Sequence, residues 1–181
     1  RKPGVSFATS GPGATNLLTG IATAQADSAP MIAVTGQVPV NMIGRDAFQE
    51  SDIIGMSNPC VKYAFQPRTP QEIPEAVKKG FYIAETGRPG PVLLDIPKDV
   101  QQNEAEITFP NEVRIPGYHP WTDVDITNIE RAVDLLLSSE KPIILAGGGA
   151  IISSAFAELQ SIAEMLMIPV VTTFKGKGSF P

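Results

Sequence analysis

Residues 4–36 read GVSFATSGPGATNLLTGIATAQADSAPMIAVTG, and this stretch decides the fold class. Its two short apolar runs, at 5–8 and 31–34, are typical of buried strands, and residues 14–26 between them carry apolar side chains near helical spacing. The Ser-Gly-Pro-Gly turn at 10–13 ends the first strand. A strand–helix–strand succession with continuously apolar strands predicts a parallel sheet that helices cover on both faces.

The same alternation continues to residue 97. We expect further strands over 61–65 and 91–96, with a helix over 70–84 between them. From residue 98 to residue 123 the sequence is polar and rich in proline, which is typical of an extended inter-domain linker.

Beyond residue 123 the hydrophobic periodicity returns. The predicted elements are a helix over 126–137, a strand over 142–146, a helix over 153–167 and a strand over 169–173. The last three form one βαβ unit. We therefore expect an α/β protein with a parallel-sheet domain over 1–101, a linker over 102–121 and the first part of a second, Rossmann-like domain over 122–181.

The charge balance and the scarcity of cysteine and histidine argue against several classes of function. Fourteen basic residues against nineteen acidic ones give a net charge of −5, and no basic cluster suits nucleic acid. Cys60 and His119 are the only residues of their kinds, so neither an internal disulfide nor a zinc cluster is expected. A lone cysteine suits a reducing compartment, and we expect the cytoplasm. No apolar run approaches the roughly 20 residues of a membrane span.

Both ends of the chain indicate that the protein continues. The first residue is Arg1 rather than methionine, and residues 169–181 read as a strand that leads into an unfinished loop. We therefore expect an internal fragment of a longer protein.

Two glycine-rich turns follow predicted strands, where free backbone N–H groups and the positive end of a helix favour anions. Neither turn fits the dinucleotide fingerprint, because Asn16 and Ile152 stand where a third glycine is required. From the residues alone, each stretch is either an ordinary turn without a ligand or part of a cofactor site.

The segment 37–50, QVPVNMIGRDAFQE, follows a predicted buried strand. It is therefore expected at the carboxyl end of a parallel sheet, where α/β proteins place their ligand sites. Its mixture of apolar and polar side chains fits a pocket wall, and it fits an ordinary surface loop equally well.

Four stretches together resemble a known family. They are GVSFATSGPGATN (4–16), DSAPMIAVTGQVP (27–39), IGRDAFQE (43–50) and GRPGPVLLDIPKDVQ (87–101). In order and spacing they are similar to the large catalytic subunit of acetohydroxyacid synthase, or acetolactate synthase, a thiamine-diphosphate enzyme. The first and last stretches are shared across the thiamine-diphosphate superfamily, whereas the series from 37 to 50 is more specific to the synthase.

The resemblance implies that residues 1–101 hold most of the pyrimidine-binding domain. In that family the SGPGATN loop lies against the aminopyrimidine of thiamine diphosphate, so Pro12 and Asn16 are the expected cofactor contacts. Phe48 and Gln49 match residues at the reaction centre, where they would shape the pocket and hydrogen-bond the reacting keto acid. Lys98 matches a lysine at the entrance, where a cation would attract carboxylate substrates.

The resemblance also implies FAD, held mainly by the central domain. Arg88 matches an arginine that contacts the flavin nucleotide, as a guanidinium suits a phosphate. The other matching positions are Gly147, Gly148, Gly149, Thr173, Phe174 and Lys175. Phe174-Lys175 departs from the Leu-Met more common at that place in the family. The flavin would be structural, because the reaction involves no net oxidation.

The implied reaction condenses two pyruvates to 2-acetolactate and CO2, or pyruvate with 2-oxobutyrate to 2-aceto-2-hydroxybutyrate. The glutamate that activates the cofactor and the ligands of Mg2+ are expected outside this chain, and Glu50 is not expected to replace that glutamate. The family also implies a homodimer or homotetramer, often with a small regulatory subunit. The alternatives are another thiamine-diphosphate enzyme, such as a pyruvate oxidase or a sulfoacetaldehyde acetyltransferase, and a non-catalytic nucleotide-binding module.

Overall fold

The computed structural model describes residues 2–120 and 123–181 and divides the chain into two compact units, 1–121 and 122–181. Residue 121, where the predicted linker ends, and residue 122, where the predicted second domain begins, lie outside the described residues. Each unit is described by itself below.

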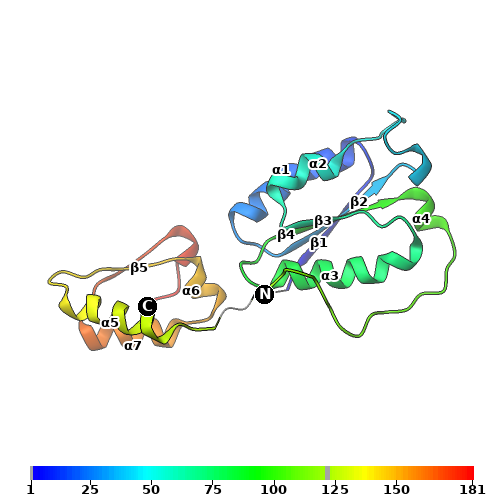
Figure 1. Cartoon of the computed structure of the whole chain (residues 1–181). Helices are drawn as coiled ribbons and strands as arrows, with labels where there is room; N and C mark the ends of the chain where they lie inside the picture. Colours follow the sequence, from blue (N-terminus) through cyan, green and yellow to red (C-terminus); the bar gives the residue numbers. More distant parts are fainter. Residues whose placement is uncertain (1, 121–122) are drawn as a thin grey trace. The chain divides into compact units, whose positions relative to one another are not determined.

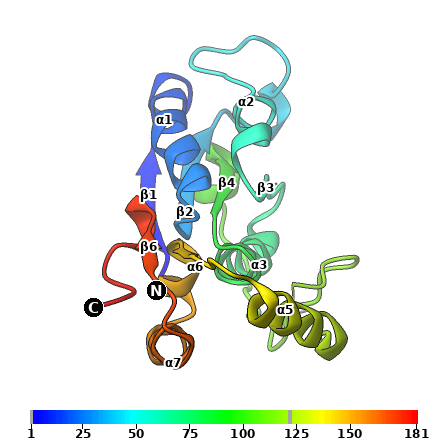
Figure 2. The ribbon, with the colours of Figure 1, turned by 90° about the vertical axis from the view of Figure 1, so that its left-hand side faces the viewer.

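Unit 1 contains a four-stranded sheet. Its strands are β1 (Gly4–Ala8), β2 (Met31–Gln37), β3 (Tyr63–Phe65) and β4 (Pro91–Pro97). They lie in the order β1-β2-β4-β3, seen from left to right in Figure 2, and all three neighbouring pairs are parallel. The predicted parallel sheet is confirmed.

The central strand β2 is longer than the predicted run 31–34. Its pairing with β4 continues through Thr35, Gly36 and Gln37 as far as Gln37 opposite Pro97. The sequence pattern marked only the apolar part of this strand, because the side chains that follow are polar and still buried at Thr35 and Gln37.

Helices cover both faces of the sheet, as Figure 1 shows. On one side lie α1 (Pro12–Ala26) and the short α2 (Ile53–Ser57), and on the other lies α3 (Ile73–Glu85). Each face has its own core. The core under α1 and α2 comprises Ala14, Ile21, Ala33, Ile53 and Leu93. The core under α3 comprises Ile32, Ala76, Ile83, Ala84, Val92 and Leu94. Successive side chains of β2 and β4 point to opposite faces of the sheet, so both strands contribute residues to both cores.

The helix predicted over 70–84 begins three residues later. Pro70–Glu72 form a 3₁₀ turn, in which Ile73 donates its N–H to the Pro70 carbonyl. An α-helical bond to that carbonyl would have to come from residue 74, which is proline and has no N–H. The α-helix therefore starts at Ile73.

The polar composition predicted an extended chain from residue 98 onward, and this prediction is wrong for the first residues after β4. Lys98–Gln102 form the short helix α4, which is too brief for periodicity to reveal. Farther along, the Tyr118 hydroxyl lies 2.9 Å from the Thr86 hydroxyl, and the Lys78 ammonium donates to the Asn111 carbonyl at 2.7 Å. Two points of the proline-rich segment are thus tied to α3 and its end.

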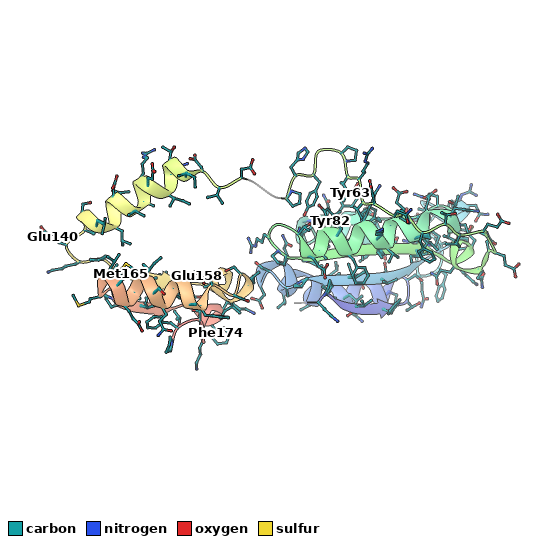
Figure 3. The ribbon with its side chains drawn as sticks, turned by 90° about the horizontal axis from the view of Figure 1, so that it is seen from below. Tyr63, Tyr82, Glu140, Glu158, Met165 and Phe174 are labelled. Atoms are coloured by element: carbon teal, nitrogen blue, oxygen red, sulfur yellow. The ribbon has the colours of Figure 1, made fainter. Side chains whose placement is uncertain are left out.

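Unit 2 contains α5 (Ile126–Ser138), β5 (Ile144–Ala146), α6 (Gly148–Ile152), α7 (Phe156–Leu166) and β6 (Val170–Thr172). The parallel pairing of β5 with β6 confirms the predicted βαβ unit. The helix predicted over 153–167 is wrong at its start, because Ser154 has a φ of 56° and interrupts the helical backbone. As Figure 3 shows, the side chains of Met165 and Phe174 project from this unit, and 92% of Phe174 is exposed.

No helix in the described parts of the chain is both long and apolar enough to cross a membrane.

Candidate active site

The carboxyl ends of β1, β2 and β4 meet at one edge of the parallel sheet. A hollow of about 420 Å3 opens there, and its lining includes Ser10, Gln37 and Lys98. A larger hollow of about 740 Å3 lies between α3 and residues 100–110, but it is mainly apolar and contains no predicted site residue. The smaller hollow is therefore the candidate active site, because polar and charged side chains line it.

Gly11 brings the two predicted motifs of this edge into contact. A Cβ atom at Gly11 would lie 2.8 Å from the Gln49 carbonyl oxygen and 3.0 Å from its Cα. Gly11 also has a φ of 60°, which favours glycine. The turn before α1 and the segment 37–50 thus pack backbone to backbone, and the predicted position of that segment at the carboxyl edge is confirmed.

The side chains nearest this contact are available to a ligand. Pro12 and Asn16 lie one turn apart at the start of α1, and both are exposed. Phe48 is 89% exposed, and Gln49, with a φ of 60°, is exposed as well. Two apolar surfaces and two amide side chains are therefore presented at the start of α1 and at the loop that touches it.

Glu50 organises the loop that carries Phe48 and Gln49. Its carboxylate accepts hydrogen bonds from the backbone N–H groups of Gly44, Ala47 at 2.9 Å and Arg45 at 3.3 Å. These bonds, chiefly those from Gly44 and Ala47, lower the pKa of Glu50 below its usual value. A carboxylate engaged in this way is a structural part of the loop.

A second carboxylate ties the loop to α4. Asp99 in α4 accepts the backbone N–H of Val40 at 3.1 and 3.2 Å, and that of Val100 at 3.1 Å. Lys98, the preceding residue, is exposed at the hollow. The first turn of α4 therefore carries both an anchor for the loop and the predicted entrance cation.

Beneath the loop lies a buried polar network centred on Asp95. Its carboxylate accepts hydrogen bonds from the Thr35 hydroxyl at 2.7 Å, the Gln66 amide at 2.7 Å and the Gln37 amide at 3.1 Å. Burial raises the pKa of Asp95, and these three bonds oppose that rise. Sequence reasoning missed both Asp95 and Asp99; the one available signal was an acidic residue inside the apolar strand PVLLDIP.

Unit 2 gathers most of the predicted flavin residues at the carboxyl ends of β5 and β6. Thr173 donates its backbone N–H to the Ala146 carbonyl at 2.9 Å. A Cβ atom at Gly148 would lie 3.1 Å from Lys175 Cβ, whereas one at Gly149 would meet nothing within 4 Å. The turn therefore offers open backbone at Gly149, as a site for a phosphate-bearing ligand requires.

Within unit 1, Arg88 lies apart from the hollow. It lies in the turn that precedes β4, at the amino edge of the sheet, opposite the hollow. Its guanidinium donates to the Ser28 hydroxyl at 2.7 Å and to the Ala26 carbonyl at 3.4 Å. The contact of Arg88 with a flavin stays a prediction.

Metal ligands are not grouped in the described residues 2–120 and 123–181. No three His, Cys, Asp or Glu side chains among them lie close enough together to hold an ion.

Comparison with known proteins assigns the chain to a class of enzyme. Residues 1–56 match the family described as thiamine pyrophosphate enzyme, N-terminal TPP binding domain, and residues 129–181 match its central domain. The chain belongs to the thiamine pyrophosphate enzymes, the thiamine-diphosphate enzymes of the resemblance described above.

Within this class the similar proteins are acetolactate synthases. The chain is 56% identical over 181 residues to a probable acetolactate synthase large subunit of Methanocaldococcus jannaschii, covering 98% of this chain and 31% of that protein. It is 50% identical over 178 residues to the acetolactate synthase large subunit of Corynebacterium glutamicum, covering 98% and 28%. It is 49% identical over 183 residues to the acetolactate synthase of Arthrospira platensis, covering 99% and 31%. The chain is thus a homologue of these enzymes and spans about a third of their length.

Proposed function

We propose that this chain is part of an acetolactate synthase that condenses two pyruvates to 2-acetolactate and CO2, or pyruvate with 2-oxobutyrate to 2-aceto-2-hydroxybutyrate. The observation that carries the proposal is the contact of Gly11 with Gln49. It joins the superfamily turn SGPG to the loop most specific to the synthase, within a chain about half identical to acetolactate synthases along its length.

Thiamine diphosphate, when bound, supplies the carbon nucleophile that attacks the keto acid. Pro12 and Asn16 would lie against its aminopyrimidine, since both are exposed on the first turns of α1. The Gln49 amide can donate to a keto-acid oxygen and accept from an amine, and Phe48 would exclude water from that contact. Lys98, exposed at the hollow, would attract the substrate carboxylate.

Two further ligands belong to the proposal. FAD would lie at the glycine turn of unit 2, where Gly147 and Gly148 face Thr173 and Lys175, and a Cβ atom at Gly149 would meet nothing within 4 Å. The contact of Arg88 with a flavin nucleotide rests on the family resemblance alone. As the family resemblance implies, Mg2+ would be held by residues outside this chain. For that reason we expect the 181 residues alone to show no synthase activity.

The proposal extends to partners and place. The relatives named large subunits support a small regulatory subunit for the whole protein, which would itself form a homodimer or homotetramer. The single cysteine fits a reducing compartment such as the cytoplasm.

The role of Gln49 can be tested in the full-length protein. Gln49→Ala is expected to lower kcat at least about a hundredfold, a size typical of losing a positioned polar group at a reaction centre, while leaving the unfolding temperature nearly unchanged. Because Gln49 has a φ of 60°, glutamine and alanine bear the same backbone strain, so Gln49→Ala changes the side chain alone. Gln49→Gly removes the side chain without that strain. If turnover falls only as far as stability falls in both variants, Gln49 is structural.

A further inference from the structure

One amide side chain, that of Gln37, contacts both ends of the loop 38–50. Its Oε1 accepts the backbone N–H of Val38 at 2.9 Å, at the start of the loop. Its Nε2 donates to the carbonyl oxygen of Ser51 at 2.9 Å, just after the loop ends. Gln37 is 5% exposed, so water cannot readily replace these bonds.

The Gln37 amide is itself held from below by Asp95. Its Nε2 also donates to Asp95 Oδ2 at 3.1 Å, and the Asp95 side chain is fully buried. Thr35 and Gln66 donate to the same carboxylate from β2 and from the residue after β3. An ionised carboxylate can only accept hydrogen bonds, so the NH2 group of Gln37, and not its Oε1, must face Asp95. Asp95 therefore fixes the orientation of the Gln37 amide.

The other anchors of the loop act elsewhere along it. Asp99 holds Val40 near the start, and Glu50 holds the backbone between Gly44 and Ala47. Gln37 joins the two ends across the base, between the end of β2 and the start of α2. The loop closed in this way carries Phe48 and places Gln49 against Gly11.

We propose that Gln37, oriented by Asp95, is a positioning residue that closes the loop 38–50 and so keeps Gln49 against the turn at Gly11. Its effect on catalysis rests on the function proposed above; its effect on the loop does not. Gln37 touches no reacting atom in this account and acts through the placement of Gln49.

The test uses Gln37→Met in the full-length protein, with Gln66→Met as the matched control. Both changes remove one amide donor from Asp95 Oδ2, but only Gln37 also bonds to Val38 and Ser51. Trypsin cleavage after Arg45, an exposed residue of the loop, reports loop opening and is followed by mass spectrometry of the released peptides. We expect Gln37→Met to accelerate this cleavage about tenfold, as loss of a buried hydrogen bond predicts, and Gln66→Met to leave it near the wild-type rate.

Turnover supplies the second reading. Gln37→Met is expected to lower kcat about tenfold with a smaller change in KM, since substrate attraction by Lys98 is untouched, while Gln66→Met retains kcat. Equal cleavage rates and equal kcat in the two variants would overturn the proposal. If Gln37→Met does not fold, the same comparison is made with Asp95→Asn added to both variants, which removes the buried charge that has lost one of its three hydrogen-bond donors. If the wild type makes no acetolactate, the proposed function fails while the cleavage rates still decide the loop closure.

Discussion

At the scale of single residues, Gly11 occupies a position where a methyl group has no room. Its backbone is left-handed and its Cβ direction points at the Gln49 carbonyl, 2.8 Å away. Gly11→Ala is expected to cost about 1–2 kcal/mol for the left-handed backbone, with about 1–3 kcal/mol more for displacing Gln49. Turnover should fall with it, since the displaced residue lies at the proposed reaction centre.

Gly20→Ala is the matched control, because it lies in α1 and a Cβ there would meet nothing within 4 Å. An exposed glycine inside a helix costs about 0.5–1 kcal/mol relative to alanine, so this variant should gain stability. Thermal unfolding of the full-length protein measures both. Similar stability for the two variants would show that the Gly11–Gln49 contact is not tight.

Asp95 makes stability depend on pH in a direction set by its burial. Because its pKa is raised above its ordinary value of 3.8, the folded state binds its proton more tightly than the unfolded state. The free energy of unfolding therefore falls as the pH rises from that value through the raised folded-state pKa. Asp95→Asn removes this loss, and its amide can still accept from Gln37 and Gln66 while donating to Thr35 Oγ1.

We expect Asp95→Asn to gain stability relative to the wild type as the pH rises from about 4 to about 7. Asp95→Ala, which leaves three donors unpaired, should lose about 1–3 kcal/mol or more at every pH. Chemical denaturation of the full-length protein across this range is the measurement. A loss for Asp95→Asn that grows with pH would mean that hydrogen bonds to the ionised carboxylate outweigh the cost of its burial.

The motif residues of the site could be predicted from the sequence, but the residues that hold them in place could not. Pro12, Phe48 and Gln49 lie in motifs that resemble a family, so their neighbourhood was expected. The roles of Asp95 and Asp99 depend on which backbone and amide groups the fold brings to them, and no local pattern records those tertiary contacts. The tight packing of Gly11 on Gln49 is likewise a product of two segments 38 positions apart in the chain.

At the scale of elements, the two sides of the glycine turn in unit 2 differ in how much room they leave. Gly149→Ala adds a methyl group that meets nothing within 4 Å, in a helix that favours alanine. If FAD approaches this backbone, the change should lower FAD affinity about tenfold without lowering the unfolding temperature. Titration of the full-length protein with FAD, followed by flavin fluorescence, tests this.

Gly176→Ala is the contrasting variant, because a Cβ atom there would lie 2.2 Å from the Ala146 carbonyl oxygen. It should destabilise unit 2 whether or not flavin binds. An unchanged FAD affinity in Gly149→Ala would mean that FAD does not bind at this turn.

Long elements were predictable and short ones were not. Periodicity located α1, α3, α5 and the parallel strands, because each repeats its apolar pattern often enough to be recognised. Five-residue helices such as α4 and α6 complete little more than one turn and leave no such pattern. The end of β2 was not predicted either, because Thr35 and Gln37 are polar. Both are nevertheless buried, and both donate hydrogen bonds to Asp95.

At the scale of the whole molecule, the chain corresponds to one part of its longer relatives. It spans about 30% of the length of relatives that are about half identical to it. Its two units carry the proposed pyrimidine contacts and the proposed flavin turn, while the Mg2+ ligands are expected elsewhere. The activity must therefore be measured on the full-length protein.

The most direct test of the account is to incubate the full-length protein with pyruvate, Mg2+ and FAD, with and without thiamine diphosphate, and to quantify acetolactate. We predict acetolactate formation that requires thiamine diphosphate, with CO2 released in equal amount. In a parallel incubation with inorganic phosphate under air, pyruvate consumed with acetyl phosphate as the product would instead indicate an oxidase-type relative. No consumption of pyruvate under any of these conditions would contradict the proposed function and leave only the fold and the family.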